Sequence, residues 1–264
     1  MSESLQMRVH GDATLPTLIY LPGLHGDWTL VGRFRAALAG RVRFVEFTYP
    51  RTLTWSLDDY AQAIHAALGE REITTGWLLG ESFGSQIAWQ MLAQAESSHD
   101  PADKIFHAPG LLLVGGFVRH PSFGCVRLVR LSNRLMPLAL FNLVLFGYAQ
   151  YARLRHGHTP GTAVQLQEFL ERRTELDRRA IVHRYGIILG NDLRPVARRA
   201  TLPVYYLSGW LDPIVPWPFV RSWLRKNCPG FRGARIVGGA DHNVLGSATQ
   251  KSAEQIVRWI SAPG

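Results

Sequence analysis

The chain has 264 residues, of which 47% are hydrophobic, so it is long and apolar enough to form one large domain or a domain with an insertion. This composition excludes a disordered chain, and no internal repeat or low-complexity run occurs. The net charge is +9 at pH 7, and fourteen arginines against five acidic residues place the whole excess between residues 119 and 200.

The N-terminal residues and the cysteines bear on the compartment. Residues 1–23 show no basic stretch followed by an apolar one, so we expect no secretory signal and a cytoplasmic protein. Cys125 and Cys228 form no spaced set, and they indicate neither a disulfide framework nor a metal site.

Short apolar runs that end near glycine or proline alternate with helical patterns along most of the chain. Predicted strands cover residues 17–21, 42–47, 76–80, 110–116, 203–209 and 234–239, and predicted helices cover 55–68, 85–95 and 247–260. Continuous apolar strands that alternate with helices are typical of a parallel sheet covered on both faces.

The alternation stops between about residues 118 and 192. This segment is rich in leucine, phenylalanine and arginine, and its pattern indicates helices and loops rather than strands. We therefore predict one α/β domain whose core consists of residues 1–117 and 193–264, with a helical insertion over 118–192.

The run Gly80-Glu81-Ser82-Phe83-Gly84 lies between the predicted strand 76–80 and the predicted helix 85–95. Glycines on both sides of a sharp turn allow it to present a serine side chain above the sheet. A tight turn without catalytic duty can carry the same pattern, but the strand–turn–helix context favours a nucleophilic serine.

A nucleophilic serine needs a base and an acid. His242 follows the last predicted strand, and Asp212 follows the strand before it, so both are expected at the sheet edge where Ser82 lies. The chain order Ser, Asp, His is the order expected for this architecture. Asp192 and Asp241 are competing acids, but the former precedes the wrong strand and the latter is the immediate neighbour of His242.

A serine nucleophile also needs two N–H groups where negative charge develops on the substrate. The backbone N–H of Phe83 is one candidate, because this residue follows the nucleophile. The loop 21–28 after the first predicted strand should supply the other, with Leu24 as the first choice and His25 as the next.

Four segments, IYLPGLHGDW, LLGESFGSQIA, DLRPVARRATLPVYYLSGWLDPIVP and GGADHNVL, together resemble the α/β-hydrolase superfamily. The resemblance implies an α/β fold with a mostly parallel eight-stranded sheet, helices on both faces, and a helical cap inserted after the sixth strand. It places the nucleophile, acid and base on Ser82, Asp212 and His242, and the oxyanion donors on Leu24 and Phe83. It implies no organic cofactor.

Two positions depart from the pattern of that superfamily. Pro22-Gly23 stands where His-Gly is usual, which should alter the support of the loop more than the donor. Ser85 stands where a further glycine is common, and we expect this change to be harmless.

The serine nucleophile argues against the dehalogenases and epoxide hydrolases of the superfamily, which use aspartate there.

The arginines of the insertion allow three interpretations. Arg127, Arg130 and Arg134 share one helical stripe, which is either solvated or forms a basic mouth for an acidic substrate, such as a phosphopantetheine conjugate or coenzyme A ester. Docking on an anionic membrane surface is the third interpretation. No recognition motif for nucleic acid accompanies the charge.

The sequence therefore predicts a serine hydrolase for a carboxylic ester or thioester. Carbon–carbon bond hydrolysis and acyl transfer with the same triad are alternatives, as is a ligand-binding member of the fold with little turnover. The fold and the triad do not encode the substrate.

Overall fold

The structure is a computed structural model, and it describes residues 4–97, 106–156 and 174–261. Seven strands form one sheet in the order β1-β3-β2-β4-β5-β6-β7. β1 runs antiparallel to β3, and the other neighbouring pairs are parallel. The strands are β1 (Gln6–His10), β2 (Thr17–Leu21), β3 (Arg43–Thr48), β4 (Trp77–Glu81), β5 (Leu111–Val114), β6 (Val204–Gly209) and β7 (Phe231–Val237).

The mostly parallel α/β sheet expected from the sequence is confirmed, but two details differ. The described residues form seven strands rather than eight, because the antiparallel edge beyond β3 consists of β1 alone. The helical insertion consequently follows the fifth strand, β5, and not the sixth. β1 was not predicted, since its residues are exposed or half-buried and its sequence QMRVH shows no apolar run.

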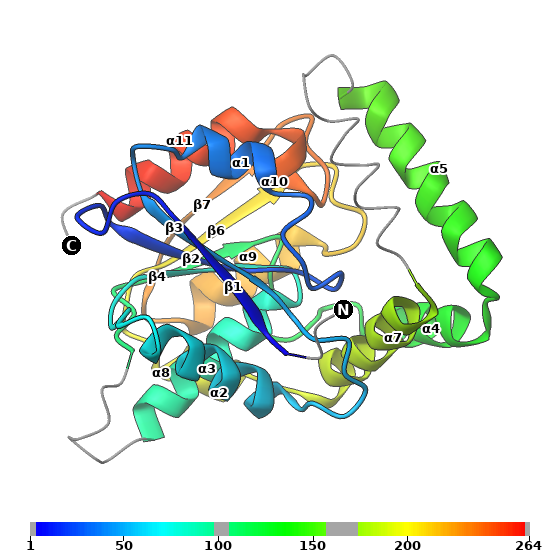
Figure 1. The fold of residues 1–264 in the computed structure, drawn as a ribbon, viewed down its shortest axis with the longest axis horizontal. Helices are drawn as coiled ribbons and strands as arrows, with labels where there is room; N and C mark the ends of the chain where they lie inside the picture. Colours follow the sequence, from blue (N-terminus) through cyan, green and yellow to red (C-terminus); the bar gives the residue numbers. More distant parts are fainter. Residues whose placement is uncertain (1–3, 98–105, 157–173, 262–264) are drawn as a thin grey trace.

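Helices cover both faces of the sheet (Figure 1). One face carries α1 (Gly32–Ala37), α10 (Val244–Ser247) and α11 (Thr249–Ile260), and the other carries α2 (Leu57–Gly69), α3 (Gly84–Ser97), α8 (Arg194–Arg199) and α9 (Trp217–Asn227). Each face has its own apolar core, so the strands β2 to β6 are buried on both sides, whereas the edge strand β7 is only partly buried.

Helix α2 illustrates how the sequence forms these layers. Ser56 and Asp59 make a reciprocal capping box that starts the helix. Its buried residues recur at helical spacing and face the sheet: Leu57, Tyr60, Ala61, Ile64 and Leu68. Burying each large apolar side chain contributes about 1.5–3 kcal/mol, so this stripe fixes which side of α2 faces the sheet.

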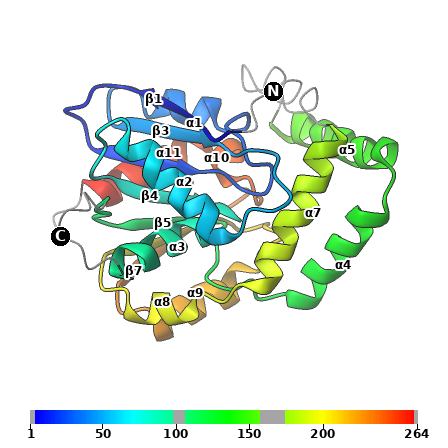
Figure 2. The ribbon, with the colours of Figure 1, turned by 60° about the horizontal axis from the view of Figure 1, so that its bottom comes forward.

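The insertion between β5 and β6 contains α4 (Phe123–Leu135), α5 (Leu138–His156) and α7 (Glu175–Gly190). These helices lie together beyond one end of the sheet (Figure 2), and both α4 and α5 contact α7. Residues 157–173, with Arg172 and Arg173, belong to the predicted insertion but lie outside the described residues. None of the described helices combines the length and apolar character needed to cross a membrane.

The arginine stripe predicted on α4 does not share one environment. Arg127 and Arg134 are exposed, whereas Arg130 is half-buried and its guanidinium lies against Gly186 of α7. The leucines of α4 do not pack on the core, because about half or more of each residue's surface is exposed: Leu128 (65%), Leu131 (52%) and Leu135 (73%).

Helix α7 is the part of the insertion that is bound directly to the α/β core. Thr174 and Asp177 cap its first turn, and Asp177 also forms an ion pair with Arg51, in the loop after β3, at 2.5 Å. One turn and a half further on, His183 Nε2 lies 2.8 Å from the carbonyl oxygen of Trp55. These contacts place the first half of α7 against the loop at the carboxyl end of β3.

Candidate active site

Ser82 lies on a sharp turn between β4 and α3. Its φ of 49° is in the left-handed region, which is strained for a residue with a side chain. The two flanking glycines are required by close packing, since a Cβ on Gly84 would lie 2.0 Å from the Leu21 carbonyl oxygen and a Cβ on Gly80 would lie 2.5 Å from the Cα of Ser85. The turn therefore has the geometry of a nucleophile elbow.

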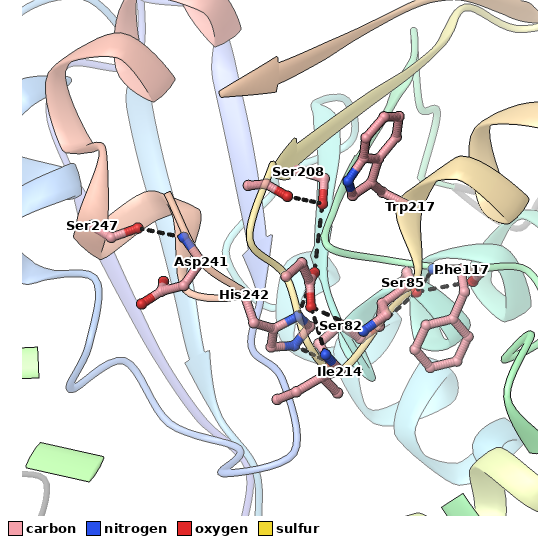
Figure 3. A network of polar contacts seen from close by, with 12 residues as sticks. Ser82, Ser85, Phe117, Ser208, Ile214, Trp217, Asp241, His242 and Ser247 are labelled. Carbon is pink, nitrogen blue, oxygen red and sulfur yellow. Dashed lines mark hydrogen bonds and ion pairs between the residues drawn. The ribbon is translucent and has the colours of Figure 1, made fainter. Parts of the chain in front are cut away.

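The structure brings together the three side chains expected to form a triad. His242 Nε2 lies 3.1 Å from Ser82 Oγ, and His242 Nδ1 lies 2.8 Å from Asp212 Oδ2 (Figure 3). Because the Asp212 carboxylate only accepts, this contact favours the tautomer with hydrogen on Nδ1 and leaves Nε2 free to accept the serine proton. Residues separated by 160 positions in the sequence thus form one chain of hydrogen bonds.

The Asp212 carboxylate is held in place by the backbone of its own loop. Its Oδ1 accepts hydrogen bonds from the N–H groups of Ile214 and Val215, both at 2.9 Å. The Asp212 side chain is fully buried. The competing acids lie elsewhere: Asp192 pairs with Arg194, and the carboxylate of Asp241 points away from the imidazole (Figure 3).

Two histidines lie at this edge of the sheet, and their pKa values are shifted in opposite directions. Burial acts to lower the pKa of His242, but the hydrogen bond and charge of Asp212, together with the charges of Glu81 and Asp241, outweigh it and raise the pKa above 6.5. Burial and the charge of His242 lower the pKa of His120 to about 4. His120 is therefore a weak base at neutral pH, and His242 is the stronger one.

Glu81, next to the proposed nucleophile, was not predicted as a site residue. It accepts a hydrogen bond from the hydroxyl of Tyr20 on the neighbouring strand β2. Burial raises the pKa of Glu81, while the Tyr20 hydrogen bond and the charge of His242 oppose that shift. A second carboxyl group thus lies close enough to His242 to influence its titration.

The loop after β2 passes close over Ser82. A Cβ built on Gly23 would lie 3.4 Å from the Cβ of Ser82. Among the described residues, the backbone N–H groups of Leu24 and Phe83 donate to no protein acceptor. Two N–H groups near a serine are the arrangement that stabilises an oxyanion.

Ser85 has a larger structural role than the sequence suggested. Its hydroxyl contacts the Ser82 carbonyl oxygen at 2.5 Å and the Phe117 carbonyl oxygen at 3.0 Å, and it accepts a hydrogen bond from the Phe117 N–H at 2.9 Å (Figure 3). A Cβ on Gly116 would lie 2.7 Å from the Cβ of Ser85, so the two segments are in close contact. This serine joins the turn of Ser82 to the segment after β5, and hydrogen bonds accommodate its side chain where a further glycine is common in the superfamily.

Within the described parts of the chain, no group of three histidine, cysteine or carboxylate side chains is placed to hold a metal ion.

Comparison with known proteins supports the fold. No protein family matches the sequence, and a search of curated proteins finds no match either. Three solved structures align over 98% of the chain: the enol-lactonase from Burkholderia xenovorans LB400 (16% identity, 96% of its chain, TM-score 0.74), the esterase from Exiguobacterium antarcticum (16%, 96%, 0.75) and an alpha/beta hydrolase enzyme from a Medee basin deep-sea metagenome library (11%, 94%, 0.75). The sheet order, the sharp turn after β4 and these similarities together show that the chain has the α/β-hydrolase fold.

Proposed function

We propose that the protein is a serine hydrolase that cleaves a carboxylic ester or thioester. The observation that carries this proposal is the hydrogen-bonded chain Asp212–His242–Ser82 at the carboxyl edge of the sheet. A serine hydroxyl is a poor nucleophile until a base takes its proton, and the Nε2 of His242 lies 3.1 Å from the Ser82 hydroxyl.

The reaction follows from the positions of these groups. Ser82 Oγ attacks the substrate carbonyl carbon while its proton passes to His242 Nε2, and Asp212 stabilises the resulting imidazolium. The N–H groups of Leu24 and Phe83 bind the oxyanion. His242 then protonates the leaving alcohol or thiol as its bond to the acyl carbon breaks. A water molecule repeats the sequence on the acyl-enzyme and releases the acid.

The ester or thioester class is supported by chemistry and by similarity. Two of the similar structures are an esterase and an enol-lactonase, and both names refer to cleavage of an ester bond. At 16% identity they share the fold, so their activity is extended to this chain only as part of the proposal. We further propose that the helices between β5 and β6 act as a cap over the site, as the position of α7 beside the loop after β2 suggests.

Replacing Ser82 with alanine tests the proposal. The protein and its Ser82→Ala variant would be assayed with p-nitrophenyl esters of increasing acyl length and with a matched acyl thioester. Loss of a triad member should lower kcat by about 10⁴-fold or more. The fold should be unchanged, because only one hydroxyl is removed.

Ser222→Ala is the matched control, since Ser222 is exposed on α9 and lies outside the hydrogen-bonded chain. A fluorophosphonate probe should label the wild type and the control but not Ser82→Ala. A Ser82→Ala variant that keeps a tenth of the wild-type activity would contradict the proposal.

A further inference from the structure

Arg184 is a buried cation at the contact between the insertion and the core. It lies in the middle of α7, and only 2% of its surface is exposed. Burying a guanidinium costs several kcal/mol unless hydrogen bonds replace its water, and an apolar side chain of similar volume would avoid that cost. The contacts of Arg184 therefore need an explanation beyond packing.

Three loops or helices of the core supply the acceptors for Arg184. Its guanidinium donates to the Leu24 carbonyl at 2.7 Å, to the Pro50 carbonyl at 3.1 Å and to the Tyr60 hydroxyl at 3.3 Å. All three acceptors are neutral, so in the described part of the chain this cation is held by dipoles and not by a carboxylate. The shortest contact is to Leu24, the proposed oxyanion donor.

The geometry of residues 23–26 shows what this contact does. The Gly26 N–H donates to the Gly23 carbonyl at 2.9 Å, which closes a turn. The Gly23 carbonyl and the Leu24 N–H belong to one trans amide and point in opposite directions. The turn therefore directs the Leu24 N–H away from Gly26, and the neighbouring Gly23 lies close to Ser82.

Arg184 holds the next amide of the same turn through the Leu24 carbonyl. The fit is close, because Gly26 has a φ of 74° and a Cβ there would lie 2.5 Å from the Arg184 guanidinium. The turn thus cannot rotate its second amide without breaking a charge-assisted hydrogen bond, and the guanidinium already fills the space beside Gly26 toward α7.

We propose that Arg184 is a positioning residue for the oxyanion hole: it holds the turn 23–26 so that the Leu24 N–H faces the negative charge that develops on the substrate. This inference rests on the proposed function and adds to it a residue of the insertion. It makes α7 part of the machinery that stabilises the transition state, although Arg184 itself need not touch the substrate.

The test compares two substitutions of Arg184 that differ in whether a hydrogen bond to the Leu24 carbonyl can form. Arg184→Met removes the three hydrogen bonds, and Arg184→Lys keeps a charged donor that can reach the Leu24 carbonyl. Arg51→Met is the matched control, because it removes the ion pair between the core and the same helix without touching the turn 23–26. For each protein we would measure Tm, kcat and KM on a p-nitrophenyl ester, and the inhibition constant of a trifluoromethyl ketone, whose serine adduct carries an oxyanion.

The expected result is a loss in kcat that is separate from substrate binding. Removing an oxyanion donor outright costs about 10²–10³-fold, so Arg184→Met should lower kcat by about 10–100-fold with KM changed less than about threefold. The trifluoromethyl ketone should bind more weakly by a similar factor. Arg184→Lys should recover most of kcat, and Arg51→Met should change it by less than about threefold.

Two outcomes would overturn the inference. One is a folded Arg184→Met protein whose kcat and ketone affinity match the wild type, or an Arg184→Lys protein that recovers none of the activity lost in Arg184→Met. The other is an Arg51→Met variant that loses as much kcat as Arg184→Met, which would make the role of Arg184 general anchoring of α7. A wild type that cleaves no ester would refute the proposed function but would not by itself decide the role of Arg184. In that case the rate at which a fluorophosphonate labels Ser82 would be compared between the wild type and Arg184→Met, because this reaction depends on the same oxyanion geometry.

Discussion

Replacing Asp212 with asparagine changes a single atom at the proposed triad, and the structure indicates how the amide would orient. Oδ1 of Asp212 accepts from two backbone N–H groups, those of Ile214 and Val215. The amide oxygen of asparagine must take that place, because its NH₂ group cannot accept. The NH₂ group then faces His242 Nδ1 and forces the imidazole to carry its hydrogen on Nε2, where it can no longer accept the proton of Ser82.

The size of the effect follows from the cost of the opposite orientation. Turning the amide over would restore the tautomer but place NH₂ against two backbone N–H groups. Leaving a buried donor without an acceptor costs about 1–3 kcal/mol. The Val215 N–H is partly buried and the Ile214 N–H is exposed, so the active arrangement lies about 1–6 kcal/mol above the inactive one. At about 1.4 kcal/mol for each factor of ten, turnover should fall by about 5-fold to about 10⁴-fold, and loss of the negative charge opposite the imidazolium favours the upper end.

The assay is steady-state hydrolysis of a p-nitrophenyl ester by Asp212→Asn, with Asp192→Asn and Asp241→Asn as matched replacements. Asp192 is paired with Arg194 at the surface, so its replacement should change kcat by less than about threefold. Asp241 raises the pKa of His242 only through its charge, and its replacement should mainly move the pH profile. If either control lost more activity than Asp212→Asn, the assignment of the acid would be wrong.

Two further predictions concern residues beside the triad. His242 must be neutral to act as a base, so kcat/KM should rise with pH through the raised pKa of His242. The charge of Glu81 contributes to raising that pKa, so Glu81→Gln should move the rise in kcat/KM to lower pH. An unchanged or higher midpoint would contradict this coupling. Ser85→Gly leaves the Phe117 N–H without the acceptor it has at 2.9 Å, which should lower the free energy of unfolding by about 1–3 kcal/mol. The Tm in a thermal melt should fall by several degrees, and an unchanged Tm would show that the hydroxyl is dispensable.

The parallel strands were predictable because each is a short apolar run that ends where a turn begins. The run TLIYL stops at Pro22, and VYYLSG stops where the loop of Asp212 begins. The residues of the triad follow such strands directly, so their common edge could be predicted from the order of strands and helices. β1 gave no such signal, because an exposed edge strand does not need an apolar run.

The contacts that hold the site could not be predicted in the same way. Tyr20 and Glu81 meet because β2 and β4 are neighbours in the sheet, which the sequence order does not reveal. Arg184 was one of fourteen arginines in a basic segment. Its position was nevertheless informative, because it occupies the apolar stripe of α7 between Ile181 and Ile188, where a charged side chain must be buried and therefore paired with acceptors.

The way in which the insertion is attached bears on how this protein can diverge. α7 is bound to the core through the ion pair of Asp177 with Arg51 and through the hydrogen bonds of His183 and Arg184. α4 and α5 contact α7 and expose apolar side chains. Sequence change at the exposed apolar positions of α4 and α5 therefore alters none of the contacts described above at the proposed catalytic groups, while change on the inner face of α7 does. Under selection for a new substrate, we expect the length and sequence of α4 and α5 to change more readily than the inner face of α7.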